Sequence, residues 1–335
     1  MPGLPERIVG GMTANTAHGA HLTTPNTHAA DQSCARLPLT ANFHFIKSCN
    51  FACRYCYATF ADSLARPVLG DEQLFALTRL LAARYTKVTF VGGEPTLYPR
   101  LPELLATARA QGALTNVVTN GFRITSAWLQ AEAGTLDLLT LSIDSATPAI
   151  HRTLGRATRR GETPSVRQYC DLADAARAAG IGVKVNTVVT TINADEDLTG
   201  LITDLAPQRW KILQAAPVEG QNDTFIADLT PQRAVFDTYV ARHQVALAGT
   251  GERIVAEPVE MIRGSYIMVD PQGRFFDSTR GAHHYSRPIL KVGMDAAFAE
   301  VEFDPTKFRD RDGDAGYRPS TEPGPRPGIA RQQAA

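Results

Sequence analysis

The chain has 335 residues, enough for one large α/β barrel or for two ordinary domains. Its 34 Lys and Arg residues balance 34 Asp and Glu residues, so no net charge draws nucleic acid or an anionic membrane to the whole molecule. These totals argue against a nucleic-acid partner and favour a small substrate, with any phosphate recognition arising from a local cluster.

The sequence contains no run of about 18 apolar residues, and its start lacks the pattern of a signal peptide. We therefore expect a soluble, cytoplasmic protein with no membrane partner. The five cysteines are an odd number, and three of them lie within eight residues. This spacing suits a disulfide framework poorly and favours a reducing compartment and a metal site.

The two ends of the chain differ from its middle. Residues 1–36 show little apolar periodicity, which predicts a disordered N-terminal arm. Residues 301–335 are predicted to form a C-terminal extension that is disordered from about Asp310. Residues 37–300 alternate strand-like segments with amphipathic helical segments, a pattern typical of βα units and a parallel sheet.

Helix signals separate six predicted strands. Leucines at helical spacing predict an apolar stripe at Leu74, Leu77, Leu80 and Leu81, and Gly180 follows an Ala-rich run as a helix-terminating residue. Six βα units predict an α/β fold, a partial (β/α)6 barrel of the TIM type, with its chemistry at the carboxyl ends of the strands. The strands are predicted at residues 42–46, 87–91, 116–119, 138–142, 182–189 and 209–213.

Three cysteines follow the first predicted strand as Cys49-x3-Cys53-x2-Cys56. Three thiolates on one loop can hold three irons of a [4Fe–4S] cluster and leave the fourth iron open to another ligand. The alternative is a structural zinc site, in a scaffold without catalysis, which needs four protein ligands and has His44 as the nearest fourth candidate. Spacing alone leaves both interpretations open.

The CxxxCxxC spacing, with Tyr55 before the last cysteine, resembles the signature of the radical S-adenosylmethionine (SAM) superfamily. The resemblance implies a [4Fe–4S] cluster and SAM as cofactors, with Tyr55 near the adenine. Electron transfer into SAM would release a 5′-deoxyadenosyl radical.

Two further segments match SAM-binding positions of that superfamily. A GGEP segment follows the second strand, and it implies that Gly92, Gly93 and Glu94 line the SAM amino group. Glycines let a backbone approach a ligand closely, and a carboxylate accepts hydrogen bonds from an ammonium group. Ser142 and Arg156 match positions that contact the SAM carboxylate and ribose, although a capping serine and a solvated arginine would look the same.

Basic side chains alternate with apolar ones on two adjacent predicted strands, as Lys184 with Asn186 and Arg209 with Lys211. Side chains two residues apart share a strand face, so each pair points to one side of the sheet. If that side is the barrel lumen, these cations need an anion, and a triphosphate offers many acceptor oxygens. The alternative is that both strands expose their basic face to water.

Six segments, in order and spacing, resemble the viperin family of antiviral, nucleotide-modifying radical SAM enzymes; they are NFHFIKSCNFACRYCYATF, KVTFVGGEPTL, VVTNG, KVNTVV, RWKILQAAPVEG and SYIMVD. The similarity runs from about residue 42 to 317. It implies that Asn42 and Lys87 also contact the nucleotide. Tyr266 is the candidate proton source, and the alternative is that it is a tyrosine of the core. Glu219 is a weaker candidate for a contact to the ribose or the base.

The reaction implied is removal of the C4′ hydrogen of CTP, UTP or GTP by the radical, followed by loss of the 3′-hydroxyl as water. The product would be a 3′-deoxy-3′,4′-didehydro nucleotide, a chain terminator for polymerases. An electron donor such as a flavodoxin or ferredoxin is then expected as a partner.

Some features depart from the family. The chain lacks an N-terminal amphipathic membrane helix, so a lipid-surface location is not expected. Only Gly316 and Tyr317 match the family's tail over the active site, which leaves the base preference open. A radical SAM enzyme for another small substrate or a peptide is the alternative. Auxiliary clusters are not expected, because the only cysteine after Cys56 is Cys170, in a predicted helix.

Overall fold

The computed structural model describes residues 37–61, 68–251 and 253–311. The described residues all belong to one compact unit. The predicted N-terminal arm and the tail residues Gly316 and Tyr317 lie outside the described residues. In the part that is described, no helix is long and apolar enough to cross a membrane.

The sheet is built around six parallel strands that lie side by side in chain order, as the alternating pattern predicts. Each covers a predicted strand, and only the ends of four of them shift. The strands are β1 (Leu37–Ile46), β2 (Tyr85–Gly92), β3 (Leu114–Thr119), β4 (Leu138–Ser142), β5 (Gly182–Val189) and β6 (Arg209–Gln214).

Four further strands extend this sheet to ten. β7 (Ile254–Glu257) pairs parallel with β6, and β8 (Ile267–Val269) pairs parallel with β1 at the other side. β9 (Arg274–Asp277) and β10 (His284–Pro288) continue from β8 as antiparallel strands. The predicted α/β fold with a parallel sheet is confirmed. The four additional strands were not predicted, because each is too short to show a two-residue period in the sequence.

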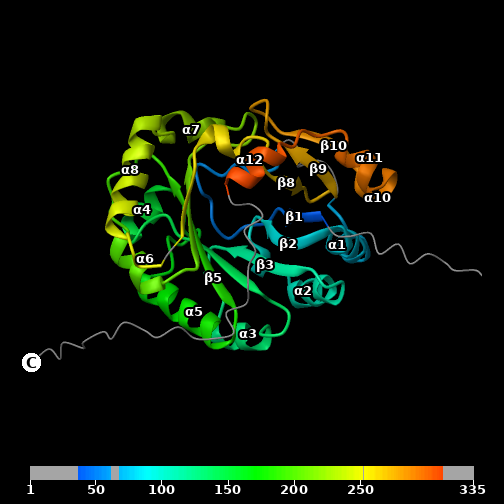
Figure 1. The fold of residues 1–335 in the computed structure, drawn as a ribbon, viewed down its shortest axis with the longest axis horizontal. Coiled ribbons are helices and arrows are strands. Elements are labelled where there is room, and N and C mark those ends of the chain that lie inside the picture. Colours follow the sequence, from blue (N-terminus) through cyan, green and yellow to red (C-terminus); the bar gives the residue numbers. More distant parts are fainter. Residues whose placement is uncertain (1–36, 62–67, 252, 312–335) are drawn as a thin grey trace, which may run out of the picture. The chain divides into compact units, whose positions relative to one another are not determined.

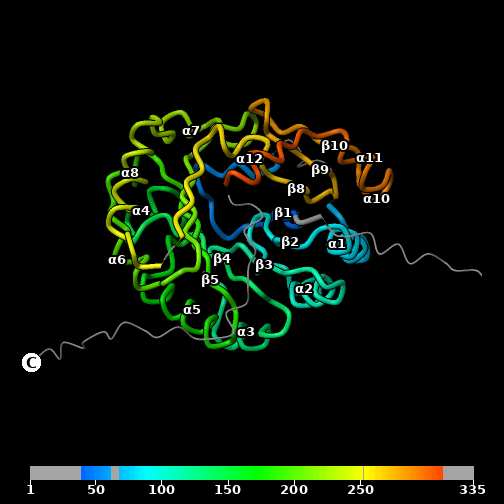
Figure 2. Tube along the Cα trace, viewed as in Figure 1, coloured from blue at the N-terminus to red at the C-terminus, as the bar shows by residue number. Residues whose placement is uncertain are grey.

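Helices connect the strands and lie around the outside of the sheet (Figure 1). α12, in the predicted C-terminal extension, lies beside β8 in Figures 1 and 2, and Asp304 at its start donates a backbone hydrogen bond to Gly264 O. The helices are α1 (Asp71–Arg84), α2 (Leu101–Ala110), α3 (Ser126–Ala131), α4 (Pro148–Thr153), α5 (Val166–Ala178), α6 (Thr199–Leu205), α7 (Asp223–Leu229), α8 (Arg233–Ala246), α9 (Val259–Ile262), α10 (Ile289–Val292), α11 (Met294–Phe298), α12 (Pro305–Asp310) and the 3-10 turn η2 (Pro95–Leu97).

The apolar stripe of α1 is narrower than predicted. Leu74, Leu77 and Leu81 are buried, whereas Leu80 is 42% exposed, so its place in the stripe was wrong. At 3.6 residues per turn, Leu80 lies about 120° around the helix from Leu74, outside the face that meets the sheet. Gly180 follows α5 with φ +75°, as expected of a residue that ends a helix.

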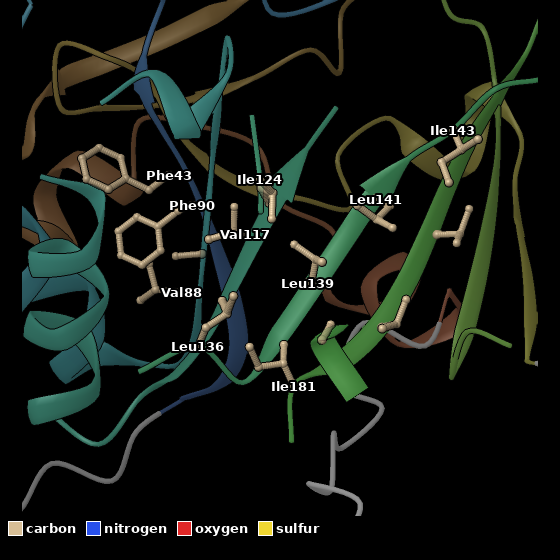
Figure 3. Close-up of a cluster of buried hydrophobic side chains, with 14 of the residues drawn as sticks. Phe43, Val88, Phe90, Val117, Ile124, Leu136, Leu139, Leu141, Ile143 and Ile181 are labelled. Carbon is tan, nitrogen blue, oxygen red and sulfur yellow. The ribbon is translucent and has the colours of Figure 1, made fainter. Parts of the chain in front are cut away.

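The two faces of the sheet have different chemistry. On β1, the apolar residues Ala41, Phe43 and Phe45 are buried in the core, while Asn42 and His44 line an internal cavity. This follows from the two-residue period of a strand. Figure 3 shows the apolar residues of this face, with Phe43 of β1 beside Phe90 of β2, and with Leu139 and Leu141 along β4. The core therefore lies between sheet and helices, and the polar inner face is free for a site.

Truncation of Leu77 tests this assignment of faces. Leu77→Ala is expected to lower the free energy of unfolding by about 2–5 kcal/mol, because Leu77 is fully buried. Leu80→Ala serves as the matched control and should change it by less than about 0.5 kcal/mol. Urea unfolding measures the free energy of unfolding of both variants. An equal loss of this free energy in the two variants would contradict the assigned orientation of α1.

Candidate active site

A cavity of about 550 Å³ lies on the inner face of the sheet. It is lined by residues from β1 to β6 and by the loop that carries the three cysteines. The structure brings into this one cavity every site residue that the sequence predicts, except Glu219. The basic residues of β5 and β6 therefore face inward, and the alternative of a basic face exposed to water does not hold.

Glu219 does not line the cavity, so its contact to ribose or base stays a prediction. Its side chain is exposed. Its backbone N–H donates to Gly281 O at 2.8 Å, and it forms an isolated bridge with Ala282. This pairing holds the segment after β6 along the loop between β9 and β10, which turns the side chain toward solvent.

The cysteine loop is held against its neighbours by backbone contacts. Ala52 N–H donates to Gly155 O at 3.1 Å, and Gly93 N–H donates to Ile46 O at 2.6 Å. A Cβ at Gly93 would lie 2.1 Å from Ser48 O, and one at Gly155 would lie 2.2 Å from Ala52 O. Both glycines are therefore required where the chain approaches the cysteine loop. For Gly93, the sequence had predicted a close approach to the ligand and not to this loop.

The three thiols share one wall of the cavity, and none forms a disulfide. Burial, with a smaller contribution from the neighbouring thiols, raises the pKa of Cys49 to about 11 and that of Cys56 to about 12. Three thiolates in one place need positive charge to stabilise them, so this donor set fits an iron–sulfur cluster, whose irons supply that charge.

The alternative of a single zinc ion finds less support. Among the described residues, no group of three His, Cys, Asp or Glu side chains converges closely enough to hold one metal ion. The ring of His44 packs against Tyr57, Phe60 and Phe276, with centroids 5.3 to 5.9 Å apart. Its position among aromatic rings does not suit a fourth zinc ligand.

Glu94 is buried, with 1% of its surface exposed, and protein groups occupy most of its lone pairs. Its Oε1 accepts from Thr96 N, Thr96 Oγ1 and Thr119 Oγ1 at 2.7 to 3.1 Å, and its Oε2 accepts from Asn120 N at 2.9 Å. Each carboxylate oxygen offers about two acceptor positions, so Oε2, which accepts one hydrogen bond, keeps one position for a ligand. The network fixes the GGEP turn and leaves one place for an ammonium group.

Arg156 lies at 5% exposure inside a polar network that reaches a cysteine. Its Nε forms an ion pair with Asp144 Oδ2 at 3.3 Å, and its Nη2 donates to Ser142 O. Its Nη1 donates to Tyr55 Oη at 3.1 Å and lies 3.9 Å from Cys53 Sγ. The Tyr55 hydroxyl donates to Asp144. Sequence reasoning missed Asp144, although an acid directly after β4 was a usable signal.

Five cations gather at the other side of the cavity, namely Lys87, Lys184, Arg209, Lys211 and Arg311. Burial, with a smaller contribution from the neighbouring arginines, lowers the pKa of Lys87 to about 8. Burial also lowers the pKa of Lys211 to about 7, although the Glu257 carboxylate offsets part of the effect. The Glu257 carboxylate forms ion pairs with two members of this group, at 2.9 Å from Lys211 and 3.5 Å from Arg311. No sequence pattern indicated Arg311 or Glu257, because each lies far along the chain from the strands it meets.

Tyr266 lies between the cations and the cysteine loop. Its hydroxyl accepts from Lys211 Nζ at 2.8 Å and donates to Glu257, and the Arg311 guanidinium stacks 3.7 Å from its ring centroid. Tyr266 also packs, together with Cys56, against an apolar cluster of Ala58, Phe60, Met268 and Phe276. The phenol is therefore positioned between the two chemical halves of the cavity.

Known proteins resemble this chain in sequence. Residues 43–205 match the radical SAM superfamily. The chain is 38% identical over 279 residues to an S-adenosylmethionine-dependent nucleotide dehydratase of Flammeovirga pacifica, covering 82% of this chain and 94% of that one. A protein of the same name from Lacinutrix mariniflava is also 38% identical over 82% of this chain, which spans 58% of its length. The S-adenosylmethionine-dependent nucleotide dehydratase RSAD2 of Danio rerio is 31% identical, covering 82% of this chain and 77% of that one.

Solved structures share the fold. Native anSMEcpe with bound AdoMet and Kp18Cys peptide superposes with a TM-score of 0.62 at 14% identity, covering 81% of this chain and 82% of that one. Streptococcus suis SuiB superposes with a TM-score of 0.55 at 16% identity, covering 71% of this chain and 60% of that one. At these identities the likeness concerns the fold alone. By its sequence relatives, the chain belongs to the radical SAM superfamily and, within it, to the family of S-adenosylmethionine-dependent nucleotide dehydratases.

Proposed function

We propose that this chain dehydrates a ribonucleoside triphosphate by radical SAM chemistry. One observation carries the proposal: a single cavity joins three thiols to the five basic side chains of Lys87, Lys184, Arg209, Lys211 and Arg311. Several buried basic side chains in one place favour a polyanionic ligand, because buried positive charges need negative charge beside them. A triphosphate ester carries about four negative charges when ionised, so its charge matches the cation group.

The thiol half of the cavity would hold the cofactors. Cys49, Cys53 and Cys56 would bind three irons of a [4Fe–4S] cluster, which supplies the electron that cleaves SAM and releases a 5′-deoxyadenosyl radical. The residues assigned to SAM line the same cavity. These are Tyr55, Gly92, Gly93, Glu94, Ser142 and Arg156.

The cation half would hold the nucleotide. Lys87, Lys184, Arg209, Lys211 and Arg311 would bind the phosphates, and Asn42 and Asn186 the sugar and its neighbouring phosphate. Within the described residues, Asn186 Oδ1 is buried without a hydrogen-bond partner, which suits an acceptor reserved for a ligand. Binding the phosphates at this side directs the ribose toward the thiol half.

The proposed reaction needs one electron and one proton besides the radical. The radical takes the C4′ hydrogen atom of the ribose, and the substrate radical then gains the electron and the proton and loses its 3′-hydroxyl as water. Tyr266 is the proton source we assign, because its hydroxyl lies between the two halves. The electron comes from a carrier such as a flavodoxin or ferredoxin. The product is a 3′-deoxy-3′,4′-didehydro nucleotide, made from CTP, UTP or GTP, which would terminate polymerase chains.

Nucleotide dependence of SAM cleavage tests this proposal. The reconstituted, reduced protein should form 5′-deoxyadenosine at least about tenfold faster with one nucleoside triphosphate than with its diphosphate, since the diphosphate leaves cations unpaired. CTP, UTP, GTP and ATP are compared with their diphosphates and with a peptide by chromatography. If none of the triphosphates stimulates cleavage, the proposed substrate class is wrong.

A further inference from the structure

Glu257 is the last residue of β7, and its side chain is fully buried. It does not line the cavity. Its carboxylate lies 2.9 Å from Lys211 Nζ and 3.5 Å from Arg311 Nη1, and it accepts the hydroxyl hydrogen of Tyr266. Three cavity-lining side chains from three different segments therefore meet on one acid that a bound nucleotide would not touch.

The charge state of Glu257 is set by those neighbours. Burial on its own would raise the pKa of this carboxyl, but the Lys211 and Arg311 cations outweigh it and hold the pKa at about 2. Glu257 is therefore an anion at any pH at which the protein works. An anion in this place is a permanent acceptor for the phenol and a permanent counter-ion for the two cations.

The geometry of Tyr266 depends on this acid. Its hydroxyl has one proton, which points to Glu257, and its oxygen accepts from Lys211 Nζ at 2.8 Å. Arg311, also paired with Glu257, stacks 3.7 Å from the centroid of the Tyr266 ring. Without the carboxylate, two buried cations would lose their partner and the phenol would lose the contact that fixes its rotation.

We propose that Glu257 is a positioning residue that acts through Tyr266 and Lys211, an inference that rests on the proposed function. It holds the phenol oxygen of Tyr266 against the Lys211 ammonium. When the 3′-hydroxyl leaves, the phenol O–H would turn from Glu257 to that hydroxyl and give it the proton. Lys211 would then protonate the phenolate oxygen and become a neutral amine. The electron of that step comes from the carrier named above. Glu257 itself stays ionised and transfers nothing.

The variant Glu257→Gln keeps the shape of the side chain and removes its charge. In the reconstituted protein, the ratio of dehydrated nucleotide to 5′-deoxyadenosine should fall at least about tenfold, because the substrate radical forms but is not converted. Calorimetry with inorganic tripolyphosphate should give equal or tighter binding, since the carboxylate opposes an anion. A ratio of dehydrated nucleotide to 5′-deoxyadenosine that stays unchanged would overturn the inference, whatever the tripolyphosphate affinity.

Asp270→Asn is the matched control. Asp270 is also fully buried and pairs with Arg274 at 2.6 Å, but it does not line the cavity. Asp270→Asn should lower the free energy of unfolding measured in urea. It should leave the ratio of dehydrated nucleotide to 5′-deoxyadenosine unchanged. An equal fall of the ratio in this control would show a general effect of losing a buried ion pair, and would contradict a specific role of Glu257.

Tyr266→Phe decides the matter if Glu257→Gln does not fold. It removes the hydroxyl through which Glu257 acts, so the product ratio must fall by a similar factor, and the double variant must be no worse than Tyr266→Phe alone. A normal ratio in Tyr266→Phe overturns the inference. If the unaltered protein forms no dehydrated nucleotide, the proposed function fails instead, and the two failures are distinguishable.

Discussion

Replacement of Cys53 by alanine is expected to abolish SAM cleavage. Cys53 lies at the centre of the cysteine loop, and its sulfur is 3.9 Å from Arg156 Nη1. With two thiols left, the loop cannot hold three irons, so the iron content should fall well below about four per chain. 5′-Deoxyadenosine formation should fall by on the order of 10³-fold or more, as when a member of an essential catalytic unit is removed.

Cys170→Ala is the control for that experiment. Cys170 lies on α5, half-buried against the edge of the core, and does not line the cavity. This variant should keep the visible iron–sulfur absorbance, the iron content and the rate of SAM cleavage. Loss of the cluster in Cys170→Ala, or a full cluster in Cys53→Ala, would contradict the assignment of the three cysteines.

The second large effect is expected at Lys184. Among the described residues its ammonium has no carboxylate within ion-pair distance, while burial, followed by Lys87, Lys211 and Arg209, holds its pKa well below the usual value. A bound triphosphate would relieve this repulsion. Lys184→Ala should therefore weaken nucleotide binding by about 2–3 kcal/mol, or roughly 30- to 150-fold in Kd.

Calorimetry measures that loss, and Lys291→Ala is the control. Lys291 is an exposed residue of α10 outside the cavity, so its variant should bind the nucleotide normally. Iron content should be unchanged in both variants. Equal affinity of Lys184→Ala and the unaltered protein would show that the phosphates lie elsewhere.

The same cations predict a pH dependence. The pKa values of Lys211 and Lys87, about 7 and about 8, are lowered by burial, and a bound anion would raise both. Binding should therefore take up protons, and affinity should fall as the pH rises above about 7, where the free protein loses those protons. Titrations in buffers of different ionisation enthalpy measure the uptake.

The local parts of this site were predictable from the sequence. The cysteine loop, the GGEP turn and the basic residues of β5 and β6 each lie within a few residues of a strand end, and the two-residue period assigns their face. Residues such as Lys184 and Lys211 could therefore be assigned to the lumen by their strand pattern together with the family resemblance. The first six strands follow from the same period.

The contacts between distant segments could not be predicted in this way. Arg311 reaches the cavity from the end of α12, where its backbone carbonyl accepts from Arg209 Nη2 at 2.5 Å. Glu257 lies on a four-residue strand that is too short to show a period. Glu219 was placed by resemblance alone, and its side chain faces solvent because its backbone pairs with the loop at Ala282. Pairings over such separations depend on tertiary packing, which a local pattern does not encode.

The most direct test of the proposed reaction uses nucleoside triphosphates that carry deuterium at C4′. With the reconstituted, reduced protein and SAM, mass spectrometry should show one labelled triphosphate converted to a product that has lost the C4′ deuterium and the 3′-hydroxyl group. The 5′-deoxyadenosine formed with it should carry the deuterium, in equal amount. Dehydrated product without deuterium in 5′-deoxyadenosine would contradict abstraction at C4′, and SAM cleavage without any dehydrated nucleotide would contradict the proposed function.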